Sequence, residues 1–300
     1  MAFGGAARSV TRCVQCVQCV QCERCDAERG ERGCMPLTDF QATVLAHVAR
    51  NRSDASYLAG EAALHIGSDG ERFSNDLDFF HNTADRVNQT FAADALVLRA
   101  AKFMVDVIHE HRGFVSAAVR RDHDATVLDW AHESAWRFRP LVSVAGGGVM
   151  LHPIDLAINK LVALAHRREP RDVVDAIFAD RHVLPFPALV WAVVDKNPGL
   201  NPASYLEQFR RRTLTPEDAA YLRFAGPYRV DEAAQHFRRM IENADTFIAA
   251  NTNREPGALL QDRRTGRFFA PLTDDDWANT REHRGALGGV IAQPADLALE

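Results

Sequence analysis

The spacing of apolar residues changes at Pro153, and this change limits the folds open to the chain. Segments typical of strands alternate with helical patterns before Pro153, whereas helical spacing alone recurs after it, as far as about residue 250. We predict helices at about 153–168, 171–180, 186–196, 203–211, 216–223 and 230–250. The pattern indicates an α+β domain over residues 35–150, followed by a helical domain over residues 151–255.

The part before Pro153 supplies the elements of a sheet and the helices that cover it. Helical spacing predicts a helix from Leu37 to Arg50, a short one over 61–66, and a long one from about 85 to 111. β-branched and aromatic residues gather in five predicted strands, at 56–60, 77–80, 114–119, 126–131 and 141–145. We therefore expect a mixed sheet packed against helices.

The two ends of the chain carry weaker patterns. All six cysteines lie in the first 34 residues, where Cys-Val-Gln repeats in tandem. Two Cys-x-x-Cys pairs could share a zinc ion, but the run lacks apolar periodicity and stands before Met35, which opens an amphipathic helix. We expect residues 1–34 to be a disordered Cys-rich tail or a misassigned start. Residues 256–300 suggest a hairpin turning at Thr265-Gly266 and a loose tail.

The composition excludes few classes of function. With 300 residues, of which 47% are hydrophobic, the chain can bury a sizeable core. No apolar run approaches the ~18 residues that span a bilayer and no secretory pattern is present, so we expect a cytoplasmic protein without membrane insertion. The formal net charge of −5 argues against a uniformly basic nucleic-acid binder, although a local patch can still contact phosphates.

The strongest chemical signal is the pair Asp76 and Asp78 in a predicted strand. Alternate residues of a strand point to one face, so two hard oxygen ligands can hold Mg²⁺ between themselves and a triphosphate. The spacing alone is weak, since two aspartates near a strand end are often a solvated turn. The preceding strand and short helix strengthen the signal, because backbone N–H groups at Gly60 and Glu61 could face the same phosphates.

Further charged residues could complete a site for phosphoryl transfer. Asp129 lies on a predicted strand and could be a third metal ligand and general base, or a plain strand-end aspartate. Lys160 interrupts an apolar helix face, where it either meets an anion such as a phosphate or extends over the core to reach water. Arg171, Asp172 and Asp175 begin the next helix, and a pair between Arg171 and Asp175 could simply stabilise that helix.

These motifs, taken in order, resemble the AbiEii/AbiGii-type nucleotidyltransferase toxins over roughly residues 37–250. That family has a glycine-rich segment before a Ser-x-Asp-x-Asp motif, and the chain has Leu58-Ala-Gly-Glu-Ala-Ala-Leu64 and Ser74-Asn-Asp-Leu-Asp78 at those places. A later lysine, followed by Arg-Asp and a further Asp, is similar to Lys160 followed by Arg171-Asp172-Val-Val-Asp175. Several such motifs in one order are fairly specific.

The resemblance implies a DNA polymerase β-like nucleotidyltransferase core with a helical C-terminal domain. Related toxins add nucleotides to tRNA 3′ ends, which blocks aminoacylation and translation, and each is paired with a cognate antitoxin protein. On this basis we expect an NTP substrate, a tRNA or other RNA acceptor, and Mg²⁺, with Mn²⁺ as the alternative metal. In some relatives the serine before the aspartates is phosphorylated by the antitoxin, which would fall on Ser74.

The expected roles follow the motifs. Asp76, Asp78 and Asp129 would hold metal; catalysis would use these three with Lys160 and Asp175; and nucleotide binding would use Gly60, Glu61, Ser74, Lys160, Arg171 and Asp172. A protein or small-molecule hydroxyl as acceptor, and a non-catalytic nucleotide-binding protein, are the alternatives.

One position departs from the family, which usually has Gly-Gly-Thr where this chain has Gly60-Glu61-Ala62. A carboxylate at Glu61 would repel a triphosphate unless it turns away or joins the metal shell.

Overall fold

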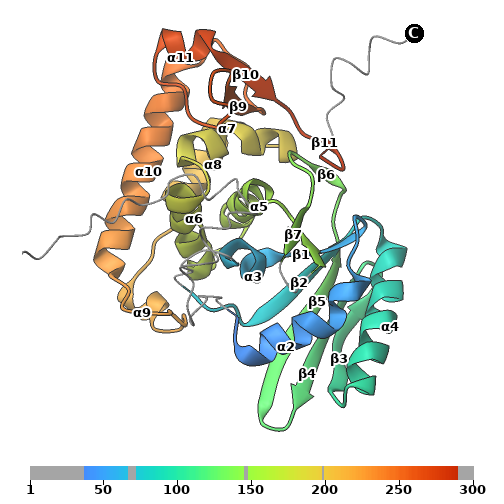
Figure 1. Ribbon diagram of the computed structural model, residues 1–300. Helices are drawn as coiled ribbons and strands as arrows, with labels where there is room; N and C mark the ends of the chain where they lie inside the picture. Colours follow the sequence, from blue (N-terminus) through green and yellow to red (C-terminus); the bar gives the residue numbers. More distant parts are fainter. Residues whose placement is uncertain (1–36, 67–71, 145–147, 198, 290–300) are drawn as a thin grey trace, which may run out of the picture. The chain divides into compact units, whose positions relative to one another are not determined.

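The computed structural model describes residues 37–66, 72–144, 148–197 and 199–289 (Figure 1). The predictions for the Cys-rich tail and for the end of the C-terminal tail, residues 290–300, lie outside the described residues. The described residues belong to one compact unit. They form an α+β structure in which a mixed sheet precedes a helical region, as the sequence predicts.

The sheet has seven strands in the order β3-β4-β5-β2-β1-β8-β7. Their bounds are β1 (Ser56–Ala59), β2 (Asp76–His81), β3 (Met104–His111), β4 (Phe114–Arg121), β5 (Asp124–His132), β7 (Val142–Val144) and β8 (Gly148–Met150). β2 pairs with β5, and β1 with β8, in parallel, whereas the other neighbours are antiparallel. The mixed sheet is thereby confirmed.

The side chains of strand β2 alternate between the two faces of the sheet. One face is covered by a helix, and the other carries charged residues. Leu77 and Phe79 are fully buried, and Trp130 of β5 lies beside Phe79 on the same face. The indole of Trp130 donates a hydrogen bond of 2.7 Å to Asp94 in α4 (Ala84–Ala100), which fixes the helix on that face. Because side chains alternate along a strand, the aspartates of β2 point to the opposite face.

Three more elements complete this part of the chain: α2 (Asp39–Val48), η1 (Ala49–Asn51) and α3 (Gly60–His65). Helix α2 packs against α4 and begins at a capping box, in which Thr38 and Gln41 satisfy each other's backbone N–H groups. Helix α3 follows β1 directly, so the chain turns at Gly60, beside the charged face of β2.

The predicted helix from about 85 to 111 is wrong in its second half. Helix α4 ends at Ala100, and Met104–His111 is strand β3 at the edge of the sheet. The chain turns at Lys102, whose φ of 67° is left-handed, and the next residue, Phe103, is buried. Apolar residues such as Val107 fit the spacing of a helix, but Val105, Val107 and Ile108 are β-branched and favour a strand. The hairpin at Gly113 pairs this segment with β4.

The helices after Pro153 follow the sequence prediction closely. They are α5 (Pro153–His166), α6 (Pro170–His182), α7 (Phe186–Lys196), α8 (Pro202–Arg210), α9 (Pro216–Ala219) and α10 (Val230–Ala250). Their apolar faces form one core cluster that includes Phe138, Phe186 and Phe237. Leu156 and Phe178 instead join the core under the sheet, so the helical region packs on it and a domain boundary near residue 150 stays a prediction.

The last described elements are β9 (Leu259–Asp262), α11 (Asp274–Ala278), β10 (Thr280–His283) and β11 (Ala286–Leu287). A turn does form at Thr265-Gly266, where Gly266 donates a backbone hydrogen bond to Asp262. Across this turn Gln261 forms an antiparallel bridge with Phe268. The regular ladder partner of β9 is β10, and β11 pairs with β6 (Trp136–Arg137).

Within the described ranges, no individual helix combines the length and apolar character needed to cross a membrane. The bent pair Pro170–His182 and Phe186–Lys196, at 116°, passes the same test of length and composition when taken together.

The start of α5 depends on a neutral histidine. His152 is the N-cap, and its Nδ1 accepts a hydrogen bond of 3.1 Å from the N–H of Ile154. Burial lowers the pKa of His152 from 6.5 to about 4, and the cations Arg139 and His283 add to this. The cap is therefore present only while the ring is unprotonated.

We predict that the protein becomes less stable as the pH falls, because protonation of His152 removes this cap. Between the unfolded pKa of 6.5 and the folded value of about 4, only the unfolded chain takes up the proton at His152. The free energy of unfolding should drop by roughly 1–2 kcal/mol from about pH 7.5 to about pH 5 on this account. In His152→Asn, which keeps a capping oxygen, urea unfolding should show a correspondingly smaller drop. His81 titrates in the same direction in both proteins, so an equal drop in both would contradict the prediction.

Candidate active site

Three carboxylates meet on the charged face of the sheet. Asp76 and Asp78 come from β2, and Asp129 comes from β5, where parallel pairing sets it directly beside Asp78. One oxygen from each lies within 4.8 Å of the others, and all three side chains are half-buried. Two strands thus bring together the three residues that the sequence singled out as metal ligands.

The surroundings of these carboxylates suit a divalent cation. Burial, and then the charge of Asp76, raise the pKa of Asp78 to about 7, while burial also raises the pKa of Asp129. One carboxylate oxygen of Asp129 is buried without a hydrogen-bond partner within the described ranges. The buried hydroxyl of Ser74 donates a 2.8 Å hydrogen bond to Asp76 and so orients its carboxylate. Hard oxygen ligands that repel one another fit Mg²⁺ or Mn²⁺.

Gly60 gives Asp78 the room that it occupies. Its φ is +67°, and a Cβ built there would lie only 1.7 Å from a carboxylate oxygen of Asp78. A glycine is therefore required twice, by the left-handed backbone and by the close approach of the aspartate.

We predict that Gly60→Ala displaces Asp78 and weakens Mn²⁺ binding by at least about tenfold, as displacement of a ligand does in known metal sites. Gly266→Ala is the matched control, because Gly266 has a φ of +70° with nothing near its missing Cβ. Both substitutions carry the left-handed strain of about 1–2 kcal/mol, but only the first should change Mn²⁺ affinity in a calorimetric titration. Equal affinities in the two variants would show that the site tolerates a side chain at Gly60.

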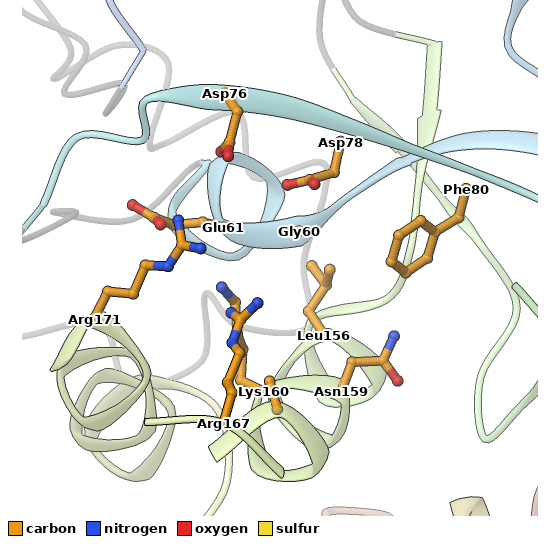
Figure 2. Close-up of a pocket in the computed structure, with 11 residues that line it drawn as sticks. Gly60, Glu61, Asp76, Asp78, Phe80, Leu156, Asn159, Lys160, Arg167 and Arg171 are labelled. Atoms are coloured by element: carbon orange, nitrogen blue, oxygen red, sulfur yellow. The ribbon is translucent and has the colours of Figure 1, made fainter. Parts of the chain in front are cut away.

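A cavity of about 170 Å³ opens beneath the aspartates of β2 (Figure 2). Its upper wall consists of Gly60, Glu61, Asp76, Asp78 and Phe80. Its lower wall consists of Leu156, Asn159, Lys160, Ala163, Arg167 and Arg171. An acidic strand thus faces a basic helix across a space open to a ligand.

Two arginines of the lower wall differ in how they are held. Arg167 makes a two-pronged ion pair with Asp172, with both N–O distances at 2.7 Å. Arg171 contacts only Glu169, at 3.9 Å, and its buried Nε has no hydrogen-bond partner among the described residues. Arg167 is therefore fixed in direction, whereas the charge of Arg171 is available to a bound anion.

Asp175 is the centre of a buried charge cluster behind the cavity. Its carboxylate lies 2.7 Å from Lys160, 3.1 Å from Arg72 and 3.3 Å from His65. Burial on its own would raise the pKa of Asp175, but these partners, Lys160 foremost, lower it well below 3.8. The ammonium of Lys160 is thus held in place at the cavity wall by Asp175.

Glu61 is turned toward Arg72, with which it forms an ion pair. Its side chain is buried, and burial, together with the charge of Asp175, raises the pKa of Glu61 to about 7. Arg72 is itself tied to the helical region by a backbone bridge to Phe224. A carboxylate at Glu61 was expected either to turn away or to join a metal shell, and in the structure it is turned away from Asp76 and Asp78 (Figure 2).

We predict that Asp175→Asn lowers the free energy of unfolding by about 3–5 kcal/mol, because it leaves buried cations without their counter-charge. Asp245→Asn is the matched control. Asp245 pairs with Arg210 on the surface, where both side chains are about half exposed, and its loss should amount to less than about 1 kcal/mol. Urea denaturation monitored by far-UV circular dichroism measures both. Similar small losses in the two variants would mean that Asp175 is no structural centre.

Some of the predicted site residues line the cavity, and others are buried away from it. Lining the cavity are Gly60, Glu61, Asp76, Asp78, Lys160 and Arg171, with Asp129 beside them. Asp172, predicted to bind nucleotide, is fully buried against Arg167 and does not line the cavity. Ser74 is likewise buried and touches Asp76 rather than the open space.

Several residues that line the cavity or lie behind its wall were not identified from the sequence. Arg167 lies seven positions after Lys160, on the same face of the predicted helix 153–168, so periodicity could have identified it, although α5 itself ends at His166. Phe80 continues the alternation of Asp76 and Asp78 and was equally accessible to that argument. Arg72 had no local signal, because its partners Glu61 and Asp175 come from other elements.

No protein-family model matches the chain, and no curated protein matches it. Among solved structures it is similar to JHP933 from Helicobacter pylori, with 16% identity and a TM-score of 0.43 over 72% of this chain and 97% of that one. It is also similar to MenT4, a nucleotidyltransferase toxin from Mycobacterium tuberculosis, with 15% identity and a TM-score of 0.48 over 69% and 82%. At these identities and TM-scores, neither likeness assigns an activity to the chain.

Proposed function

We propose that the chain is a divalent-metal-dependent nucleotidyltransferase that transfers NMP from an NTP to an RNA hydroxyl, with the tRNA 3′ end as the leading acceptor. The observation that carries the proposal is the cluster of Asp76, Asp78 and Asp129 facing Lys160 and Arg171 across one cavity. Carboxylates that can hold Mg²⁺, opposite cations that can hold phosphate, are what phosphoryl transfer requires.

Some residues of the site contact the triphosphate, and others hold those residues in position. Lys160 and Arg171 contact the triphosphate, Asp175 positions Lys160, and Asp172 positions Arg167 at the same wall. When bound to the three aspartates, Mg²⁺ or Mn²⁺ neutralises charge that develops on the phosphate oxygens. Its binding also offsets the mutual repulsion of these carboxylates.

The reaction forms one bond and breaks another at the α-phosphorus. The acceptor hydroxyl oxygen bonds to the α-phosphorus, the bond from that phosphorus to the bridging oxygen breaks, and pyrophosphate leaves. Asp129 takes the hydroxyl proton, since one of its carboxylate oxygens has no hydrogen-bond partner in the described structure and burial raises its pKa. The transfer needs no further reactant.

The order of motifs in the sequence extends the proposal to a toxin with a cognate antitoxin, acting in the cytoplasm. Transfer to a protein or small-molecule hydroxyl is the alternative, because the donor side of the cavity is the same for each acceptor. The non-catalytic alternative rested on repulsion by Glu61, and the ion pair with Arg72 removes that reason.

We predict that the full chain, incubated with total tRNA, Mg²⁺ and each labelled NTP in turn, transfers label to tRNA. Asp76→Asn should reduce the rate by roughly a hundredfold or more, because the metal loses a ligand. Asp124→Asn is the matched control: it makes the same chemical change at the exposed start of β5, the strand that carries Asp129, and should react like the wild type.

The alternatives give different results on the same denaturing gel. Label in protein, or in a small molecule after chromatography, would keep the transferase and replace the acceptor. Tight NTP binding by calorimetry without any transfer would establish the non-catalytic protein. Equal rates for Asp76→Asn and the wild type would overturn the assignment of the site.

A further inference from the structure

The cavity has two chemically different ends. One end carries the cations Arg167 and Arg171, and the other carries Phe80, Leu156 and Asn159 (Figure 2). Asp76 and Phe80 are four residues apart on a strand, and thus about 13 Å apart along β2. Asn159 lies within α5, and Arg167 is the C-cap residue just after the last residue of that helix, His166, which is about 11 Å along the helix axis from Asn159. The strand and the helix therefore separate the charged and uncharged ends by similar lengths.

The phosphates of a nucleotide belong at the cationic end. Arg171 has a buried Nε without a partner in the described structure, and Arg167 is aimed by its pair with Asp172. Lys160 lines the same cavity and is held by Asp175. If the phosphates of a nucleotide occupy the charged end, its base is the part that can occupy the uncharged end.

The uncharged end offers what a planar base needs. Phe80 is half-buried at the cavity, so one aromatic surface is open to a ligand while the rest packs on the sheet. Leu156, almost fully buried, supplies an apolar wall from α5. Stacking on an aromatic ring stabilises any nucleobase, so Phe80 and Leu156 provide affinity without choosing among bases.

Asn159 is the polar group at this end. Its carboxamide has no hydrogen-bond partner among the residues that the structure describes, although it lines the cavity. The side chain offers two N–H donors and one oxygen acceptor, a set that matches the edge of a base. A helix position that only needed to be soluble would not need to face the cavity.

We propose that Phe80 and Asn159 form a nucleobase subsite, in which Phe80 stacks on the base and Asn159 hydrogen-bonds its edge and determines which NTP is used. The inference rests on the proposed nucleotidyl transfer and adds to it the residues that select the nucleotide. Neither residue holds metal or phosphate, so both can be changed while the rest of the site stays intact.

We predict that Asn159→Asp shifts selectivity toward bases with an amino group, because a carboxylate accepts hydrogen bonds but donates none. The test compares kcat/KM for CTP against UTP and for ATP against ITP, pairs that exchange an amino group for a carbonyl. At least one of the two ratios should rise by about tenfold or more, since a buried carbonyl facing a carboxylate is rejected. Asn88→Asp, on the exposed surface of α4, is the matched control and should change neither ratio.

Further variants keep the test decisive. If Asn159→Asp loses all turnover, Asn159→Leu should bring the four kcat/KM values closer together, because the edge is no longer bound. Phe80→Leu should raise KM for every NTP by up to about tenfold and leave the ratios unchanged.

Unaltered ratios in active Asn159 variants would overturn the subsite. If the wild-type chain uses no NTP at all, the proposed function fails instead, which is a different result.

Discussion

The carboxylate of Asp175 holds the site together, because it is the only buried anion in the described structure that contacts three separate segments carrying Lys160, Arg72 and His65. These segments are α5, the approach to β2, and α3. In a low-dielectric interior, cations without a counter-charge would be driven toward water and would move the walls of the cavity with them. The position of Lys160 also fixes α5, the helix that carries Asn159 and that ends at the C-cap residue Arg167. One buried side chain thus sets both the stability of the region and the geometry of the lower wall.

The upper wall depends on the two-residue period of β2. Leu77 and Phe79 are buried beneath α4, so the alternate positions must face the cavity, and there the chain has two aspartates and Phe80. A shift of one residue in the register would bury the carboxylates in the core and expose the apolar side chains, at a cost of several kcal/mol for each unpaired charge. The packing of the core therefore enforces the direction of the chemical groups. The same alternation sets the aspartates of the proposed metal site beside Phe80, which belongs to the proposed nucleobase subsite.

Sequence reasoning succeeded where a local period decides the structure and failed where partners come from distant segments. Asp76, Asp78 and Asp129 could be brought together because strands alternate and neighbouring strands align. Residues 104–111 could not be assigned correctly, since their apolar spacing suits a helix and the turn at Lys102 uses no glycine. The ion pair of Arg72 and the burial of Asp172 could not be predicted either, because each depends on which elements pack against the residue. Asp172 lies behind the cavity for this reason, whereas Gly60, at the end of β1, lines it, and the nucleotide contacts predicted for both residues stay predictions.

Charge balance around the cavity explains why Glu61 is compatible with the proposed nucleotide site. The carboxylates number six, namely Glu61, Asp76, Asp78, Asp129, Asp172 and Asp175, against four cations, Arg72, Lys160, Arg167 and Arg171. Pairs behind the wall cancel most of this charge, and Arg72 cancels that of Glu61 in particular. What remains is the three aspartates facing Arg171, an excess of negative charge that would repel a triphosphate by itself. Divalent cations at the aspartates reverse this sign, so metal and nucleotide should bind cooperatively, and a carboxylate at Glu61 is tolerated as long as Arg72 accompanies it.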